Sequence, residues 1–139
     1  MSSALYQAEL VARAREAFGK GRLPDAAASA TLDNPLCGDR VTIDLARTDG
    51  RVSAIGHEVK GCLLCEAAAA TIAAFGRDKT PEELRAMRKA AAALMKDGTP
   101  APAPFSDLAV FTPVHEAKSR RDCVLLPFEA LEKALAAAF

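Results

Sequence analysis

Residues 40–60 read RVTIDLARTDGRVSAIGHEVK. The first half of this stretch alternates apolar and polar residues, which is the period of a strand with one buried face. The apolar residues are Val41, Ile43 and Leu45. Asp49-Gly50 is typical of a tight hairpin turn, so residues 51–60 are expected to return as the antiparallel partner strand. The apolar phase slips within this return strand, and a bulge near Ile55-Gly56 would explain the slip.

Two elements are expected before this hairpin. Residues 3–18 show the apolar spacing of an amphipathic helix, and Gly19 suits its end. The apolar stripe of this helix consists of Tyr6, Leu10, Ala14 and Phe18. Residues 28–32 form a weaker strand pattern, because alanine is a poor strand former. The sequence thus predicts a third strand that precedes the hairpin.

Two helices are expected directly after the hairpin. Residues 62–75 contain Glu66 as their one charged residue, so this helix should be buried on most sides. A second helix is expected over residues 81–96. Thr80 as N-cap and Glu83 three residues later form a capping-box pattern at its start, with a proline at the first helical position.

The remaining third of the chain adds further helical patterns. Ser106 is expected to cap a short helix that ends at Pro113, and a last helix is expected over residues 127–138. Strands followed by helices indicate an α+β fold, in which an antiparallel sheet of about three strands packs against helices. A length of 139 residues suits a single domain, residues 1–139, with one core.

Composition excludes several classes of function. Half of the residues are apolar and the formal net charge is zero. This argues against a nucleic-acid surface, which needs a basic stripe, and against a polybasic membrane patch. The longest uncharged run, residues 67–76, is too short to span a bilayer, and no signal-peptide pattern is evident at the start. The expected compartment is the cytoplasm, where four cysteines indicate metal or sulfur chemistry more than a disulfide framework.

The positions of the cysteines relative to the hairpin are informative. Cys37 lies in a turn that leads into the first hairpin strand, and Cys62 follows the second strand. The start of one strand and the end of its antiparallel partner lie at the same end of a sheet. Cys37 and Cys62 should therefore be neighbours.

Two further residues complete a ligand set. Asp39 lies two positions after Cys37, and in an extended segment such residues point the same way. Cys123 lies just before the last expected helix, so Cys62 and Cys123 are both near helix N-termini, where the dipole favours a thiolate. Thiolates and a carboxylate together form a mixed soft and hard ligand set that suits zinc or an iron–sulfur cluster.

Some of these residues also have a purely structural interpretation, which competes with the interpretation as metal ligands. A buried cysteine is often a small core residue, and this is the favoured interpretation of Cys65. Asp39 alone would often be a turn or cap residue. His57 is interpreted as a strand residue and His115 as a surface residue.

Three motifs at these positions resemble the IscU/SufU/NifU N-terminal family of iron–sulfur cluster assembly proteins. They are NPLCGDR at residues 34–40, Gly61-Cys62 opening an alanine-rich helix, and Cys123 before LLPFEALEKAL at residues 125–135. The resemblance implies that a [2Fe–2S] cluster or zinc is held by three cysteines and an aspartate. By position these are Cys37, Asp39, Cys62 and Cys123.

The resemblance also implies partners and a reaction. A cysteine desulfurase of the SufS/IscS type would supply persulfide sulfur, with Cys37 and Cys123 as the candidate sulfur acceptors. Apo iron–sulfur proteins would receive the product. Whether the chain acts as a scaffold or as a zinc-dependent sulfur acceptor, with a sulfurtransferase activity, is left open by the sequence.

Several features resemble the SufU branch of the family. The long separation between Cys62 and Cys123 matches an insertion that IscU lacks, and Asp122 stands where IscU has a histidine. The Leu-Pro-Pro-Val-Lys segment by which IscU engages an Hsp70-type chaperone is missing, which argues against that partnership. Cys65 is an addition to the family pattern, and the sequence assigns it no role.

Two other functions are kept as alternatives. Cys62-x-x-Cys65 at a helix N-terminus could serve a thiol–disulfide oxidoreductase, but the parallel βαβ pattern typical of that class is absent from the sequence. The chain could also be a structural zinc module without sulfur chemistry.

Overall fold

The computed structural model describes residues 7–36 and 38–139. Its sheet has three antiparallel strands in the order β1-β2-β3, which confirms the predicted α+β class. The strands are β1 (Ala28–Asn34), β2 (Asp39–Thr48) and β3 (Arg51–Lys60). The helices are α1 (Ala8–Glu16), α2 (Leu63–Phe75), α3 (Pro81–Asp97) and α4 (Arg121–Ala138), with 3-10 segments η2 (Ser106–Glu116) and η3 (Lys118–Arg120) before α4.

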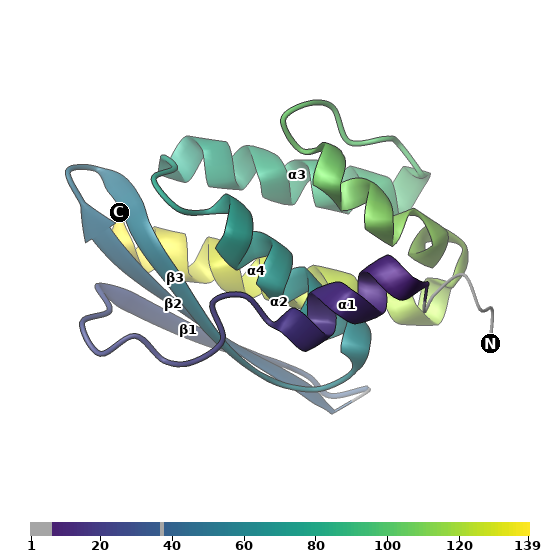
Figure 1. Cartoon of the computed structure of the whole chain (residues 1–139), viewed down its shortest axis with the longest axis horizontal. Coiled ribbons are helices and arrows are strands. Elements are labelled where there is room, and N and C mark those ends of the chain that lie inside the picture. Colours follow the sequence, from purple (N-terminus) through teal and green to yellow (C-terminus); the bar gives the residue numbers. More distant parts are fainter. Residues whose placement is uncertain (1–6, 37) are drawn as a thin grey trace.

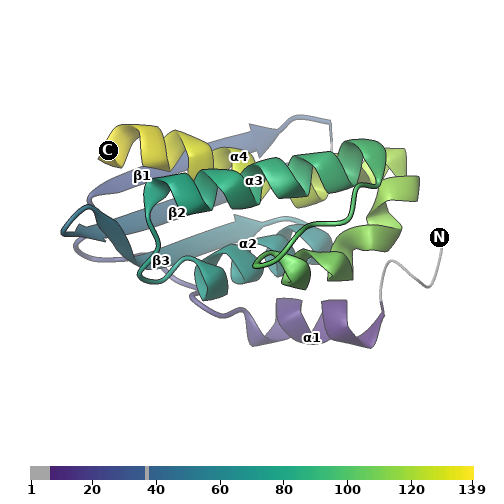
Figure 2. The same cartoon turned by 90° about the horizontal axis from the view of Figure 1, so that it is seen from above.

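The helices cover one face of the sheet. Helix α4 packs on β1 and β2, and α2 packs on β3 (Figure 1). Helix α1 lies against α2 at one side of the helical layer, and α3 lies against α4 on the side away from the sheet (Figures 1 and 2). Among the described residues, no helix is both long and apolar enough to cross a membrane.

The core lies between the sheet and this helical layer. The alternation predicted for β2 is confirmed on the core face, where Val41, Ile43 and Leu45 are fully buried. The other face is not exposed as expected, because Thr42 and Asp44 are buried as well. Helix α2 is buried along most of its length, as its lack of charge predicts, and its alanines let α1 and α4 approach closely. The capping box of Thr80 and Glu83 at the start of α3 is also present.

The hairpin turn is as predicted, but the bulge is displaced. Asp49 and Gly50 both have positive φ, 53° and 76°, as a type I′ turn requires. The pairing runs from Ala46 opposite Ala54 to Arg47 opposite Val52, which leaves Ser53 as the extra residue. The prediction near Ile55-Gly56 is therefore wrong by two to three positions. A bulge at Ser53 places Val52 and Ile55 on the same buried face, whereas Ala54 faces the other way.

The end of α1 differs from the prediction. Ala17 adopts a left-handed conformation with φ 48° and caps the helix, so Phe18 lies outside it and is 44% exposed. The early turn allows residues 19–21 to pair with the edge of β3, where the Gly21 N–H donates to the carbonyl of His57 at 2.8 Å. Tyr6, the first residue of the predicted stripe, lies outside the described residues.

Two helix boundaries that were predicted at prolines are wrong. Helix α4 begins at Arg121 and continues through Pro127, which was expected to start it. The side chains of Val124 and Phe128 are buried on either side of Pro127, and this packing offsets the backbone hydrogen bond that a proline removes. The segment η2 likewise continues through Pro113 to Glu116 as a 3-10 helix.

Candidate metal centre

Asp39 is the first residue of β2 and lies in phase with Val41 on the face of the sheet that the helices cover. Its side chain is therefore directed into the interior at the end of the core, and the residue is only 5% exposed. Within the described part of the chain, its buried Oδ2 atom has no hydrogen-bond partner. A buried carboxylate oxygen without a partner is costly, and a cation satisfies it.

Cys62 occupies the N-cap position of α2, directly after the end of β3. Its backbone is extended, with φ −79° and ψ 168°, and its side chain makes no capping hydrogen bond. The residue is half-buried. Because the hairpin returns the chain to the same end of the sheet, Cys62 lies near Asp39, as the sequence predicts for this end of the hairpin.

Cys123 lies in the first turn of α4 and is 3% exposed. The sequence places it just before a helix that starts at residue 127, whereas the structure includes it in the helix. Its position near a helix N-terminus is nevertheless as expected. The packing of α4 on β1 and β2 brings this first turn to the end of the sheet where Asp39 begins its strand.

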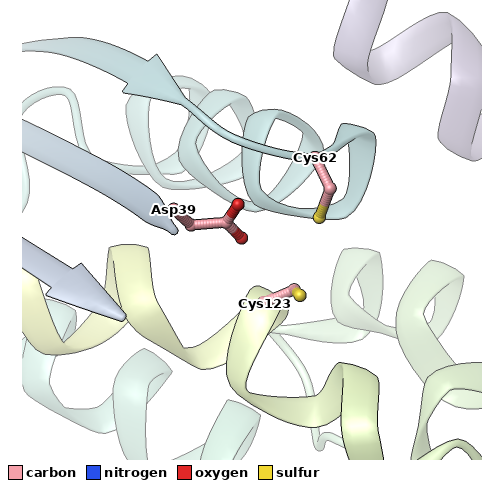
Figure 3. A group of neighbouring side chains, drawn as sticks. All are labelled: Asp39, Cys62 and Cys123. Carbon is pink, nitrogen blue, oxygen red and sulfur yellow. The ribbon is translucent and has the colours of Figure 1, made fainter. Parts of the chain in front are cut away.

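These three side chains meet at one point. One ligand atom from each of Asp39, Cys62 and Cys123 lies within 4.8 Å of the other two. Figure 3 shows the carboxylate and the two sulfur atoms facing a common space from one strand and two helices. Two thiols and a carboxylate, one oxygen of which has no partner among the described residues, fit zinc, iron or an iron–sulfur cluster.

Cys37, the fourth predicted ligand, lies outside the described residues. The turn around it is described on both sides. Gly38 has φ +76° and its N–H donates to the carbonyl of Asn34 at 2.8 Å, while Leu36 is 91% exposed. Cys37 is two positions before Asp39 in the chain. Because it lies outside the described residues, its role as a ligand stays a prediction.

The other predicted residues lie apart from the three-residue group. Cys65 is fully buried within α2, which fits its interpretation as a core residue. His57 is also buried, in β3, and His115 is half-buried, with its Nδ1 atom 2.9 Å from the carbonyl oxygen of Met95. Asp122 is exposed in the first turn of α4.

Gly61 belongs to the Gly61-Cys62 motif of the sequence, but no role in the site was predicted for it. A Cβ atom added to it would lie 2.6 Å from Oδ1 of Asp39. The strand register contained the necessary signal. Arg40 pairs with Lys60, so one further step of the same ladder places Asp39 opposite Gly61.

The chain is similar in sequence to proteins of known description. No family model matches the chain. Two proteins of Archaeoglobus fulgidus, named iron-sulfur cluster assembly scaffold proteins IscU 1 and IscU 2, are each 31% identical over 80 residues, or 58% of this chain. The chain spans about half, 52%, of the length of these curated relatives.

Solved structures match over almost the whole chain. The N-terminal part of a nitrogen-fixing NifU-like protein from Brucella abortus is 34% identical, with a TM-score of 0.92 over 98% of this chain and 95% of that one. An iron-sulfur cluster assembly scaffold protein of the SUF system from Fervidobacterium islandicum is 24% identical, with a TM-score of 0.89 over 97% and 99%. The second likeness concerns the fold alone.

Proposed function

The chain belongs to the IscU/SufU/NifU N-terminal family, and from this premise we propose that it is an iron–sulfur cluster assembly scaffold. The observation that carries the proposal is the meeting of Asp39, Cys62 and Cys123, where Oδ2 of Asp39 has no hydrogen-bond partner in the described part of the chain. Cys37 is proposed as the fourth ligand. The cargo is a [2Fe–2S] cluster, and zinc is the ion expected to occupy the same residues when iron is absent.

Each residue has a distinct proposed task. Cys62 and Cys123 supply thiolates, which hold soft metal ions strongly. Asp39 supplies an oxygen, which is a harder and weaker partner for such ions and can leave more easily. The burial of Asp39 and Cys123 keeps bulk water away from the site and strengthens the attraction between a bound cation and its ligands.

The proposed sulfur donor is a cysteine desulfurase of the SufS/IscS type. A thiolate of this chain attacks the outer sulfur of the persulfide on the desulfurase. A new S–S bond forms on this chain, and the desulfurase cysteine leaves as a thiolate, so the step needs no oxidant or reductant. Cys123 is only 3% exposed, and this burial favours Cys37 over Cys123 as the first acceptor.

A second candidate function uses the same residues. SufU-like sequence features, among them Asp122 and the long separation of Cys62 from Cys123, favour a zinc-dependent sulfur acceptor. Apo iron–sulfur proteins are the proposed receivers of the cluster or its sulfur. We propose the cytoplasm as the place of action, because reduced thiols persist there. A partnership with an Hsp70-type chaperone is not proposed.

Metal analysis and desulfurase kinetics on the purified protein separate the two functions. A scaffold loaded anaerobically with iron and sulfide should become brown and transfer its cluster to an apo-ferredoxin. A zinc-dependent acceptor should be isolated with one zinc ion and should increase the rate of sulfide release by the desulfurase. Protein that binds neither metal nor cluster and leaves the desulfurase rate unchanged would contradict both.

The buried position of Cys65 argues against the oxidoreductase alternative. A Cys-x-x-Cys redox pair needs an accessible thiolate and a resolving partner, and Cys65 is fully buried. The sheet described here is also purely antiparallel, unlike the parallel βαβ setting of that motif.

A further inference from the structure

Gly61 and Asp39 approach each other more closely than two ordinary residues could. A Cβ atom built on Gly61 would lie 2.6 Å from Oδ1, 2.7 Å from Cγ and 3.0 Å from Cβ of Asp39. These are the three nearest atoms to that position, and all belong to the one carboxylate side chain. A side chain at residue 61 would therefore occupy the space that the Asp39 side chain now fills.

The backbone does not require glycine at this position. Five other glycines have positive φ, the region that favours glycine, and Gly61 is outside that group. Gly61 is also exposed, so close packing inside the core does not demand a small residue. The remaining reason for the absence of a side chain is the neighbouring carboxylate.

The ladder geometry explains the approach. Directly opposite residues of an antiparallel pair place their side chains on the same face, with Cβ atoms about 4.5–5.5 Å apart. Beyond the pair of Arg40 and Lys60, Asp39 faces a residue without a side chain, so its carboxylate can lie over the backbone of Gly61. Cys62, the next residue, faces the same space (Figure 3).

We propose that Gly61 is a positioning residue of the metal centre, which by its missing side chain admits the Asp39 carboxylate as the oxygen ligand beside Cys62 and Cys123. This inference rests on the proposed function for its metal. A side chain at residue 61 would displace the carboxylate and leave the thiolates in place. The end of the Asp39 side chain rotates more easily than the strands move, so the displacement should change the ligand set more than the fold.

The effect of a methyl group at residue 61 can be observed without metal. In a crystal structure of metal-free Gly61→Ala, the Asp39 carboxylate should be rotated away from Cys62 and Cys123, while β2, β3 and the start of α2 shift by no more than a few tenths of an ångström to relieve the 3.0 Å approach of Cβ of Asp39. An unmoved carboxylate, with the strand ends separated instead, would overturn the inference. This measurement decides the inference even if the wild-type protein binds no metal, a result that would contradict the proposed function alone.

Cobalt titration tests the consequence for the ligand set. Gly61→Ala and Asp39→Gly should each weaken Co²⁺ binding about tenfold, the lower end of the range for lost support of a ligand. Both should change the cobalt d–d absorption bands in the same way. The double variant should bind no more weakly than Asp39→Gly, because the methyl group then has no carboxylate to displace.

The double variant and a neighbouring control separate positioning from folding. Asp39→Gly removes the Cβ that would lie 3.0 Å from the new methyl group, so the double variant should regain the melting temperature of Asp39→Gly without regaining the wild-type cobalt spectrum. Lys60→Ala changes the adjacent exposed residue and should leave the spectrum unchanged. If the loss of Co²⁺ affinity in the double variant equals the product of the losses in the two single variants, Gly61 acts independently of Asp39, and the inference is overturned.

Discussion

The Nε2 atom of His57 lies 2.8 Å from the carbonyl oxygen of Phe18, so a buried imidazole of β3 is tied to the segment that follows α1. A carbonyl can only accept, so Nε2 carries the hydrogen of this bond. In the neutral ring, Nδ1 is then an acceptor, and it has no partner within the described residues. The hydrogen bonding therefore suits a neutral imidazole in the folded protein.

Acidification should destabilise the fold through His57. Burial, the largest influence, lowers the pKa of His57 below its ordinary value, although the bond to Phe18 opposes this. The unfolded chain therefore takes up a proton first, and the free energy of unfolding should fall as pH decreases below about 6.5. Urea unfolding of metal-free protein at several pH values measures this. His57→Phe should flatten this dependence of the free energy of unfolding on pH, and an unchanged slope in that variant would contradict the assignment.

Asp44 lies on the face of the sheet opposite the helices, where its carboxylate accepts hydrogen bonds from three residues. Its carboxylate accepts from Arg22 Nε at 2.7 Å, Ser29 Oγ at 2.5 Å and the Leu23 N–H at 2.9 Å. Burial alone would raise the pKa of Asp44, but these hydrogen bonds outweigh it and the pKa is lowered. Its contribution to stability is therefore present near neutral pH and is lost as pH falls through the lowered pKa.

Asp44→Asn should consequently reduce the free energy of unfolding by about 2–3 kcal/mol at neutral pH, because it removes the charge and leaves buried donors poorly matched. Asp33→Asn is the matched control. Asp33 pairs with Arg40 at 2.6 Å, but both side chains are more than half exposed, so the loss should stay below about 1 kcal/mol. Denaturant unfolding of the two variants makes the comparison, and equal losses would contradict the proposed importance of the Asp44 cluster.

The two cysteines of α2 should differ in their effect on metal. Cys62→Ser should lower the zinc or iron content sharply, because Cys62 provides one of the converging ligand atoms. Cys65→Ser should leave the metal content near that of the wild type and cost about 1–3 kcal/mol of stability, because it places a hydroxyl in the core. Elemental analysis and thermal melting of both variants measure this. Loss of metal in Cys65→Ser would show that the ligand assignment is wrong.

Much of the fold could be predicted because its signals are local. The Asp49-Gly50 turn and the capping box of Thr80 and Glu83 are encoded within a few residues, and the structure has both. The start of α4 could not be predicted in this way. Pro127 is locally a helix-start signal, and only the burial of its neighbours against the sheet explains why the helix continues through it.

The candidate site, too, could be predicted only where short-range sequence patterns determine the positions of its residues. Hairpin topology alone predicts that Asp39 and Cys62 lie at one end of the sheet, and the structure places them there. Cys123 reaches them through the packing of α4, which no short-range pattern encodes. The role of Gly61 was not predicted, because it depends on a steric contact with a residue 22 positions away in the sequence.

Sulfur transfer should leave its product on one cysteine first. After incubation with a desulfurase from the same organism and cysteine, mass spectrometry should find one added sulfur on Cys37, because Cys123 is almost fully buried. Cys37→Ser should abolish the early adduct, and Cys65→Ser should retain it. An early adduct on Cys123 would reverse the proposed order, and an adduct on neither cysteine would contradict the sulfur-accepting role.

The chemistry of Asp39 predicts a separation between holding a cluster and releasing it. Three thiolates hold a soft metal strongly, whereas a carboxylate oxygen binds it more weakly. A site that must open to release its cargo benefits from one ligand that leaves easily, as other metal sites keep an exchangeable position. The oxygen of Asp39 is the one non-thiolate donor in the proposed set.

Asp39→Ala should therefore still bind a reconstituted cluster at micromolar protein concentration but transfer it several-fold more slowly to an apo-ferredoxin. The physical reason is that the variant lacks the one ligand of the proposed set that leaves easily. Absorption spectra of donor and acceptor give the transfer rate, and thermal melting gives the stability of the variant. If Asp39 only capped the turn after Cys37, its loss would cost about 1 kcal/mol of stability and leave the transfer rate unchanged. That pair of results would remove Asp39 from the ligand set, because a carboxylate that binds the cluster must influence how the cluster leaves.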